Sequence, residues 1–245
     1  MPAVHTDRVI MLLADGARPD VMEDLLAQGR LPHMATSMIG QGSFRSATTV
    51  FPSTTGPAYL PFLTGASPGP CNFPGIRWLD KARFAKGERL FAHRSYCGFE
   101  SLLMGRDLAP HIQSLFQLVP DSFSIFSSLA KGAGSRNLTR FMKIWYWYYA
   151  HLTDRWGYAD AVALDKIRDV LERRPEMRFL FAVLPGIDEY AHLAHPHHAS
   201  VLRQYEYLDC VVGELVTFLR ARGKWEGTQL WIVSDHGLSK TDHHF

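Results

Sequence analysis

Uninterrupted apolar runs and amphipathic segments alternate toward both ends of this 245-residue chain. Runs rich in aliphatic residues predict buried strands, and three such runs occupy residues 8–14, 178–184 and 229–234. Apolar positions spaced three and four residues apart predict helices, and they fall in residues 20–28, 159–173 and 199–222. Strands that alternate with helices of this length are typical of βαβ units. The pattern therefore predicts an α/β fold built on a mainly parallel sheet.

The middle of the chain lacks this regularity. Residues 48–57 are rich in Thr, Ser, Pro and Gly, which predicts a loop leading into the apolar residues 58–63. From residue 66 to residue 156 the periodicity is weak and Pro and Gly interrupt it, so we expect no regular strand of the main sheet there. We predict one catalytic domain over residues 1–245, with a cap inserted at residues 85–156.

An aromatic block stands inside this predicted cap, where six of the nine residues in 141–149 are Phe, Trp or Tyr. Such a block suits a lipid or nucleobase pocket, or a membrane surface. Its helical spacing is equally that of a helix packed inside the cap, and we favour this second interpretation.

Composition and charge exclude several classes of function. The 26 Lys and Arg nearly balance the 24 Asp and Glu, for a formal charge of +2, which argues against a dedicated binder of nucleic-acid polymers. The three cysteines form no C-x-x-C pair, so neither a disulfide framework nor a thiolate zinc module is indicated. No apolar run has the length of a transmembrane segment, and the N-terminus lacks the order of a signal peptide. We therefore expect a cytoplasmic protein of undetermined oligomeric state.

Three predicted strands are followed by an acidic residue: Asp15, Asp188 and Asp235. The carboxyl ends of parallel strands meet at one edge of a sheet, and carboxylates brought together there either bind a cation or repel one another. Two of them come with imidazoles, because His192 lies four residues after Asp188 and His236 follows Asp235. A single strand-end Asp is more often a helix cap than a ligand. Three of them with two histidines predict a site for zinc or a similar divalent metal.

The same residues belong to four motifs, spread from residue 9 to residue 237. They are the strand ending in Asp15-Gly16, the stretch from Phe51-Pro-Ser-Thr-Thr55-Gly-Pro57 to Thr64-Gly65, Asp188-x-x-x-His192, and Ser234-Asp235-His236-Gly237. In this order they resemble the type I phosphodiesterase/nucleotide pyrophosphatase branch of the alkaline phosphatase superfamily. The resemblance implies an alkaline-phosphatase-like sheet with helices on both faces, two zinc ions and a covalent phosphothreonine intermediate.

The resemblance also implies a role for each matching residue. One metal would be held by Asp15, Asp235, His236 and the nucleophilic threonine, and the other by Asp188, His192 and one further histidine. The family places its nucleophile nine residues before the Thr of the closing Thr-Gly. Counting back from Thr64 gives Thr55, which we prefer to its neighbour Thr54.

Two parts of the family pattern are incomplete here. The last metal ligand is expected downstream of Asp235-His236-Gly237, where His244 is our candidate and His243 the alternative; otherwise the chain is truncated before that ligand. Relatives that cleave nucleotides also carry an asparagine shortly after the Thr-Gly element. This chain has Gly75-Ile76-Arg77 there, so Arg77 becomes the candidate for binding substrate phosphate.

We therefore expect a metal-dependent phosphodiesterase or nucleotide pyrophosphatase that acts on a small phosphorylated substrate, with zinc, manganese or another divalent metal. The alternatives within the superfamily are a phosphomonoesterase, a phosphonate hydrolase and a phosphotransferase. An inactive, truncated metal-binding remnant is the alternative from another class.

Overall fold

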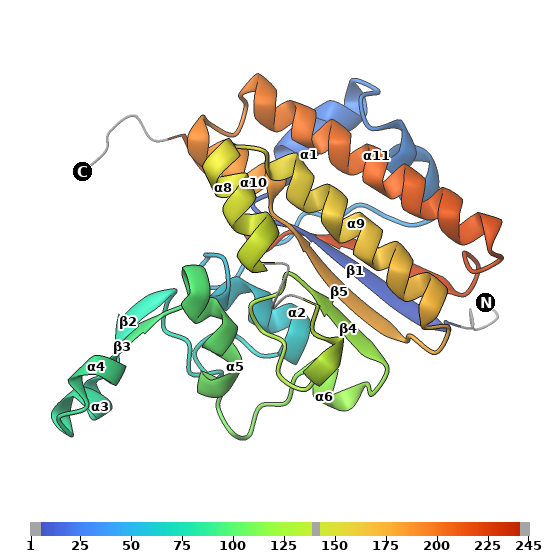
Figure 1. Cartoon of the computed structure of the whole chain (residues 1–245). Coiled ribbons are helices and arrows are strands. Elements are labelled where there is room, and N and C mark those ends of the chain that lie inside the picture. Colours follow the sequence, from blue (N-terminus) through green and yellow to red (C-terminus); the bar gives the residue numbers. More distant parts are fainter. Residues whose placement is uncertain (1–5, 139–142, 241–245) are drawn as a thin grey trace.

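Four parallel strands form the central sheet of the protein. The computed structural model describes residues 6–138 and 143–240, and its main sheet has the order β4-β5-β1-β6 (Figure 1). The strands are β1 (Arg8–Ala14), β4 (Ser122–Ile125), β5 (Phe179–Leu184) and β6 (Thr228–Val233). Ala14 pairs with Leu184, and Leu13 pairs with Val233, so β1, β5 and β6 end at nearly the same level. The α/β fold with a mainly parallel sheet is confirmed.

Helices cover both faces of this sheet (Figure 1). The long helices α9 (Trp156–Arg173) and α11 (Ala199–Ala221) lie over one face together with α1 (Pro19–Ala27). The short helices α2 (Leu60–Thr64), α5 (Met104–Asp107) and α6 (Leu115–Leu118) lie on the other. The long helices and the strands β1, β5 and β6 begin and end within three residues of the predicted positions, because their apolar periodicity is strong.

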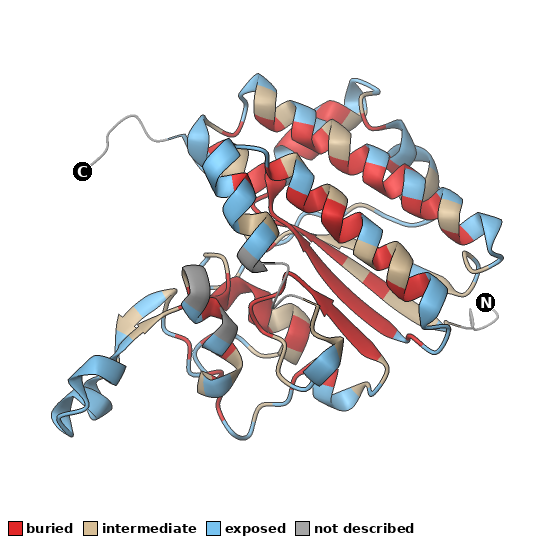
Figure 2. Cartoon of the chain, viewed as in Figure 1, coloured by how far each residue is buried: buried red, intermediate tan, exposed pale blue. Residues whose placement is uncertain are grey.

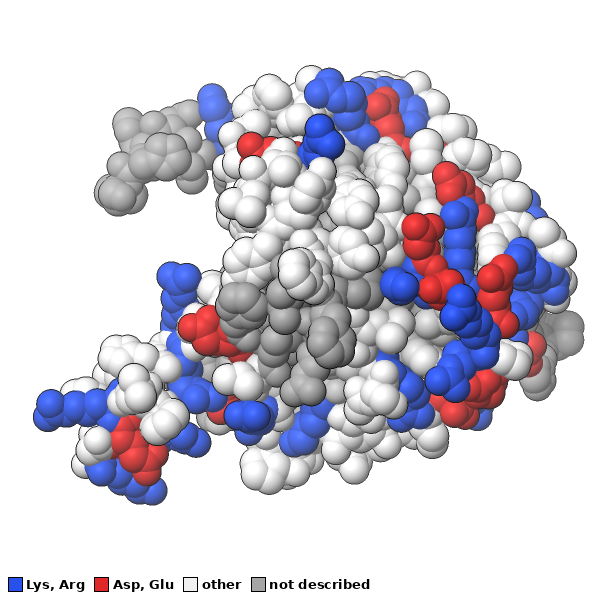
Figure 3. Space-filling view, in the orientation of Figure 1, with Lys and Arg blue, Asp and Glu red and all other residues white. Residues whose placement is uncertain are grey.

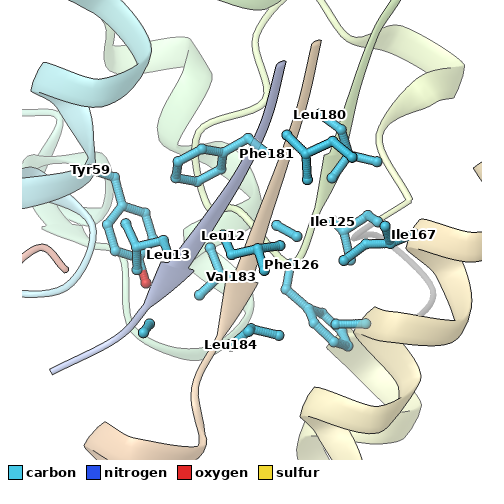
Figure 4. Packing of buried hydrophobic residues seen from close by; sticks show 14 of the residues in the cluster. Leu12, Leu13, Tyr59, Ile125, Phe126, Ile167, Leu180, Phe181, Val183 and Leu184 are labelled. Carbon is cyan, nitrogen blue, oxygen red and sulfur yellow. The ribbon is translucent and has the colours of Figure 1, made fainter. Parts of the chain in front are cut away.

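The centre of the core lies on β5 and β1. All six residues of β5 are buried, and Figure 2 shows this strand and its neighbours as the most buried part of the chain. Leu12 and Leu13 of β1 pack among Val183, Phe181 and Tyr59 (Figure 4). A parallel strand covered on both faces needs apolar side chains in both directions, which accounts for the uninterrupted run Phe-Leu-Phe-Ala-Val-Leu.

The stretch predicted to contribute nothing to the sheet contains one of its strands. β4 pairs with β5 over Ser122–Ile125, so this expectation is wrong for these four residues. Serine alternates with Phe123 and Ile125 in the strand, and all four residues are buried, so no continuous apolar run marks it. Whether the rest of residues 85–156 acts as a cap stays a prediction.

Short elements make up most of the remaining described chain. They are η1 (Met34–Ile39, a π-helix), η2 (Pro57–Tyr59), β2 (Arg77–Leu79), α3 (Lys81–Ala85), α4 (Arg89–Ala92), β3 (His93–Ser95), η3 (Gly98–Leu103), η4 (Gly134–Arg136), η5 (Lys143–Trp147), α8 (Tyr148–Thr153) and α10 (Gly186–Leu193). Helix α10 carries both Asp188 and His192, although no helix was predicted between the apolar run 178–184 and residue 199. Pro185 stands directly before this helix, and proline is well tolerated where a helix begins.

The aromatic block is partly packed and partly exposed. The ring of Trp147 lies 5.5 Å from that of Trp156 and 5.7 Å from that of Phe126, as expected for a packed helix. Trp145 is 72% exposed, which differs from that expectation, and residues 141 and 142 lie outside the described part of the chain. None of the described helices has the length and apolar character needed to span a membrane.

Candidate active site

The carboxyl edge of the sheet brings the predicted acidic residues together. Asp15 directly follows β1, Asp235 lies two residues after β6, and Asp188 stands in the first turn of α10. One ligand atom each from Asp15, Asp188 and His236 lies within 4.8 Å of the other two. The strand ends therefore converge as the sequence predicted, and we call these three residues with Thr55 and Asp235 the site cluster.

Thr55 places its hydroxyl inside this cluster. Its Oγ1 lies 3.1 Å from His236 Nε2 and 3.3 Å from Asp15 Oδ1. The residue stands two positions before η2, in the tight turn through Gly56. Thr54 takes part in this turn through its backbone, where its carbonyl accepts a hydrogen bond from Ala58 N. Of the two threonines, Thr55 has its hydroxyl in contact with Asp15 and His236.

The imidazole of His236 joins the carboxylates of β1 and β6. Its Nε2 lies 3.3 Å from Asp235 Oδ2 and 3.5 Å from Asp15 Oδ1. Gly16 N donates to Asp235 Oδ1 at 3.4 Å. Gly16 has a φ of +68°, and a Cβ there would lie 2.7 Å from Asp188 Oδ1. The glycine is required both by the left-handed backbone and by the approach of the third carboxylate.

Asp188 and His192 form a pair one helical turn apart on α10. His192 Nε2 lies 3.4 Å from Asp188 Oδ2, and the histidine side chain is 63% exposed. Its bond to Asp188 raises the pKa of His192. Glu189 stands next to Asp188, and burial together with the charges of Asp188 and Asp15 raises the pKa of Glu189 to about 7. His192 therefore borders the site cluster through Asp188, with its imidazole open to solvent.

Burial disfavours the ionised form of the clustered carboxylates in the absence of a cation. Burial, and after it the charge of Asp188, raises the pKa of Asp15 to about 6. The pKa of Asp235 lies well above its ordinary value because of burial and the nearby Asp15. Asp188 Oδ1 and Asp235 Oδ2 are buried and accept no hydrogen bond. Buried acceptors without donors, next to an imidazole nitrogen, fit a divalent cation that takes oxygen and nitrogen ligands.

Tyr59 is a site residue that the sequence analysis missed. Its phenolic hydroxyl donates to Asp15 Oδ2 at 2.5 Å, and the side chain is buried. Burial and the negative charge of Asp15 raise the pKa of Tyr59, so the hydroxyl stays protonated as a donor. Tyr59 sits in an apolar run, where a tyrosine is normally a core residue, so no sequence signal marked it.

Asp160 and Gln204 fix the start of the helix that carries Asp188. Asp160 Oδ2 accepts from Gln204 Nε2 at 2.5 Å, and Oδ1 accepts from Gly186 N at 3.3 Å. Burial raises the pKa of Asp160 to about 7. The pair was missed, although the signal was available: Asp160 occupies the apolar face of its helix, four residues after Trp156 and three before Ala163.

Arg18 ties the segment after the Asp-His motif to α1. Its Nη1 donates to the carbonyl of Leu238 at 2.7 Å, while Nε and Nη2 bind the Asp20 carboxylate. Thr49 also donates a hydrogen bond to the Asp235 carbonyl. These contacts hold both sides of the Asp235-His236 turn.

Of the predicted site residues that the structure describes, Arg77 lies outside the cluster. Arg77 is exposed on β2 and shows no contact with the cluster among the described contacts. His243 and His244 lie outside the described residues. Their assignment to substrate phosphate and to the second metal stays a prediction.

Comparison with known proteins gives three results. The model of the family described as type I phosphodiesterase/nucleotide pyrophosphatase matches residues 9–245. GPI ethanolamine phosphate transferase 1 of Gibberella zeae is 21% identical over 269 residues, which cover 99% of this chain and 25% of that protein. Murine ectonucleotide pyrophosphatase/phosphodiesterase 5, an inactive threonine-to-alanine variant solved with AMP, has a similar fold. Its TM-score is 0.63 at 14% identity, over 94% of this chain and 57% of the murine one.

The chain therefore spans a quarter of the curated relative and little more than half of the murine structure. The family match, however, covers nearly all of this chain, from the first strand through the Asp235-His236 turn. The chain belongs to the type I phosphodiesterase/nucleotide pyrophosphatase family.

Proposed function

We propose that this protein is a metal-dependent phosphoric-ester hydrolase of the phosphodiesterase type, with Thr55 as its nucleophile. One observation carries the proposal. The Thr55 hydroxyl lies within 3.3 Å of both Asp15 and His236, beside carboxylate oxygens of Asp188 and Asp235 that are buried without a hydrogen-bond donor. A hydroxyl held in such a group is placed to act on a phosphorus atom rather than to cap a helix.

We assign the candidate ligands to two metal sites, following the family pattern. Asp15, Asp235, His236 and Thr55 would hold one ion, and Asp188 with His192 and a further histidine, for which His244 is the candidate, would hold the other. Zinc suits this set of oxygen and nitrogen donors, and manganese is the alternative. When bound, the two cations supply the positive charge that lowers the pKa of the Thr55 hydroxyl and offsets the charge of the phosphoryl oxygens.

The proposed reaction has two displacements at phosphorus. In the first, the bond from Thr55 Oγ1 to phosphorus forms while the bond to the leaving-group oxygen breaks, which gives a phosphothreonine and a free alcohol. In the second, a water oxygen bonds to phosphorus while the bond from phosphorus to Thr55 Oγ1 breaks, which releases the phosphate monoester and restores the Thr55 hydroxyl with a proton from the water. Tyr59 holds Asp15 in place through both steps, and Asp160 holds the start of α10.

The relatives support this assignment. The murine structure is that of an inactive threonine-to-alanine variant with AMP bound, so a threonine matters there and a small phosphorylated ligand is accepted. We infer the same class of ligand for this chain. The missing asparagine and the position of Arg77 leave nucleotides as one possibility among small phosphoric esters.

The test compares two soluble substrates in zinc-containing buffer. We expect faster turnover of bis-p-nitrophenyl phosphate than of p-nitrophenyl phosphate by the wild type. The Thr55→Ala variant should lose turnover and keep most of its bound metal, and the matched Thr54→Ala variant should keep both. Full activity of Thr55→Ala would overturn the mechanism. Cleavage of a phosphonate or sulfate ester alone would overturn the choice of substrate.

A phosphotransferase is the second candidate, because the curated relative is named as one. In that case the phosphothreonine is attacked by an alcohol rather than by water. Adding an alcohol such as ethanolamine or glycerol to the assay and searching for its phosphate ester by mass spectrometry separates the two. A product distribution dominated by the transferred ester would replace the hydrolase proposal.

A further inference from the structure

A small arm projects from the body of the protein. It consists of residues 77–95, in which β2 and β3 form an antiparallel pair and α3 and α4 form the tip (Figure 1). Figure 2 shows the tip as exposed. Helices α3 and α4 pack mainly on each other and on β3, so the tip of the arm is left exposed to solvent or to a binding partner.

Large apolar side chains stand exposed on this tip. Leu90 is 84% exposed, Phe91 59% and Phe84 45%. Single exposed apolar residues are common on protein surfaces, but several on a tip of a dozen residues indicate an interaction site. Leu79, at the end of β2, is also exposed and extends the apolar surface toward the base of the arm.

Basic side chains surround these apolar ones. The arm holds six Lys and Arg against two Asp and Glu, a formal charge of +4, whereas the whole chain has +2. The rest of the chain is therefore slightly acidic, and the positive charge is concentrated on the arm. Figure 3 shows the blue side chains gathered around white ones at the tip. In the described part of the chain, Lys81 and Lys86 make no ion pair, so their charges are available to a partner.

The base of the arm is firmly attached. Arg94 forms an ion pair with Asp107 of α5, and the Tyr96 hydroxyl donates to the same carboxylate at 2.6 Å. The ring of Trp78 packs 6.1 Å from Phe73 and 5.1 Å from Tyr96. Asp80 accepts from Arg83 N and so caps α3. The arm is thus a structured element that holds its apolar tip away from the body.

We propose that the arm, residues 77–95, docks the protein on the surface of an anionic phospholipid bilayer. Exposed Leu and Phe enter the boundary between head groups and acyl chains, while long Lys and Arg side chains reach the lipid phosphates. The arm joins exposed apolar side chains to a formal charge of +4, which is complementary to the apolar boundary and the anionic head groups of such a bilayer. The site cluster takes no part in this docking, so the proposal stands independently of the catalytic one.

The test measures binding of the whole chain to lipid vesicles by co-sedimentation. One set contains phosphatidylcholine alone, and in the other about a third of the lipid is phosphatidylglycerol. We expect binding to the second set, weakened by added salt, and little binding to the first. The double variant Leu90→Ser/Phe91→Ser should bind at least about tenfold more weakly, because two apolar side chains no longer enter the lipid. Lys81→Glu/Lys86→Glu should weaken binding to anionic vesicles by about tenfold or more.

Two control variants match these changes outside the arm. Leu118→Ser alters an apolar residue as exposed as Phe91, and Arg173→Glu reverses an exposed charge at the end of α9; both should bind like the wild type. All variants should have the melting temperature of the wild type. Their turnover of bis-p-nitrophenyl phosphate should also equal that of the wild type, whether or not the wild type cleaves this substrate. Wild-type binding that ignores lipid charge, or an equal loss in the controls, would overturn the proposal. Failure to bind either vesicle set would also overturn it. If light scattering then showed a dimer that depends on the arm, the partner of the arm would be a second copy of the chain and not a lipid surface.

Discussion

The hydroxyl of Tyr59 donates to one oxygen of the Asp15 carboxylate, and the hydroxyl of Thr55 lies against the other. The two residues stand four positions apart, on either side of the turn that begins η2. One carboxylate of β1 is therefore held from both sides by a single loop. This relationship joins the position of the candidate nucleophile to that of a candidate metal ligand.

Replacing Tyr59 by Phe should uncouple this loop from Asp15. The variant leaves Asp15 Oδ2 buried without a donor, which costs about 1–3 kcal/mol of unfolding free energy in the metal-free protein. Losing a group that orients a ligand commonly lowers metal affinity or activity by about 10–100-fold. Urea unfolding and zinc titration measure the two effects. Tyr207→Phe, on the half-buried face of α11, is the control, and identical behaviour of the two variants would contradict a role for Tyr59.

The candidate acidic ligands and the missed residues differ in how visible they are in the sequence. Asp15 and Asp235 follow apolar strands directly, so strand prediction alone places them at one edge of the sheet. Tyr59 acts on Asp15 and Gln204 acts on Asp160 across 44 positions of the chain in each case. Contacts of that kind depend on tertiary packing, which periodicity does not describe. The strand β4 was missed for a related reason, since its serines are buried by neighbouring segments rather than by any property of their own.

The buried carboxylate of Asp160 should make the metal-free protein less stable as the pH rises. Its pKa is about 7 in the folded protein, against an ordinary value of 3.8, so the folded state binds this proton more tightly than the unfolded chain. Stability is therefore greatest at low pH on this account, and it falls between about pH 4 and about pH 7 by up to about 4 kcal/mol. Other groups titrate in the same range, so the contribution of Asp160 is obtained by difference.

The Asp160→Asn variant removes this one contribution. Relative to the wild type, its unfolding free energy in the absence of metal should improve as the pH is raised through that window. Urea unfolding at the two ends of the window gives the comparison. An unchanged difference between variant and wild type at both ends would mean that Asp160 is ionised in the folded protein throughout.

Metal binding should weaken steeply in mild acid. The pKa of Asp15 is raised to about 6 by burial and by Asp188, and a bound cation must displace that proton. Zinc should therefore stabilise the protein strongly near pH 7.5, and much less at about pH 5. Melting curves with zinc and with a chelator, recorded at both pH values, test this. Equal stabilisation at the two values would show that the cluster carboxylates are already ionised when metal-free.

Gly16 offers a way to disturb the site cluster without changing any of its polar groups. Gly16 and Gly29 both have left-handed backbones, with φ of +68° and +71°, but a Cβ at Gly29 meets nothing within 4 Å. An alanine costs about 1–2 kcal/mol at either position because of its backbone conformation. At Gly16 the added Cβ would also lie 2.7 Å from Asp188 Oδ1, so the third carboxylate must move away from Asp15 and His236.

The two alanine variants therefore separate backbone strain from damage to the site. Gly29→Ala should lose stability alone, and its zinc affinity should equal that of the wild type. Gly16→Ala should lose more stability and bind zinc at least about tenfold more weakly at the second site, because the added Cβ displaces the Asp188 carboxylate that is proposed to hold that ion. Isothermal titration with zinc and urea unfolding measure both quantities in the same samples. If both variants kept full zinc affinity, Asp188 would not be a metal ligand, and the second of the two metal sites proposed for this protein would have to be abandoned.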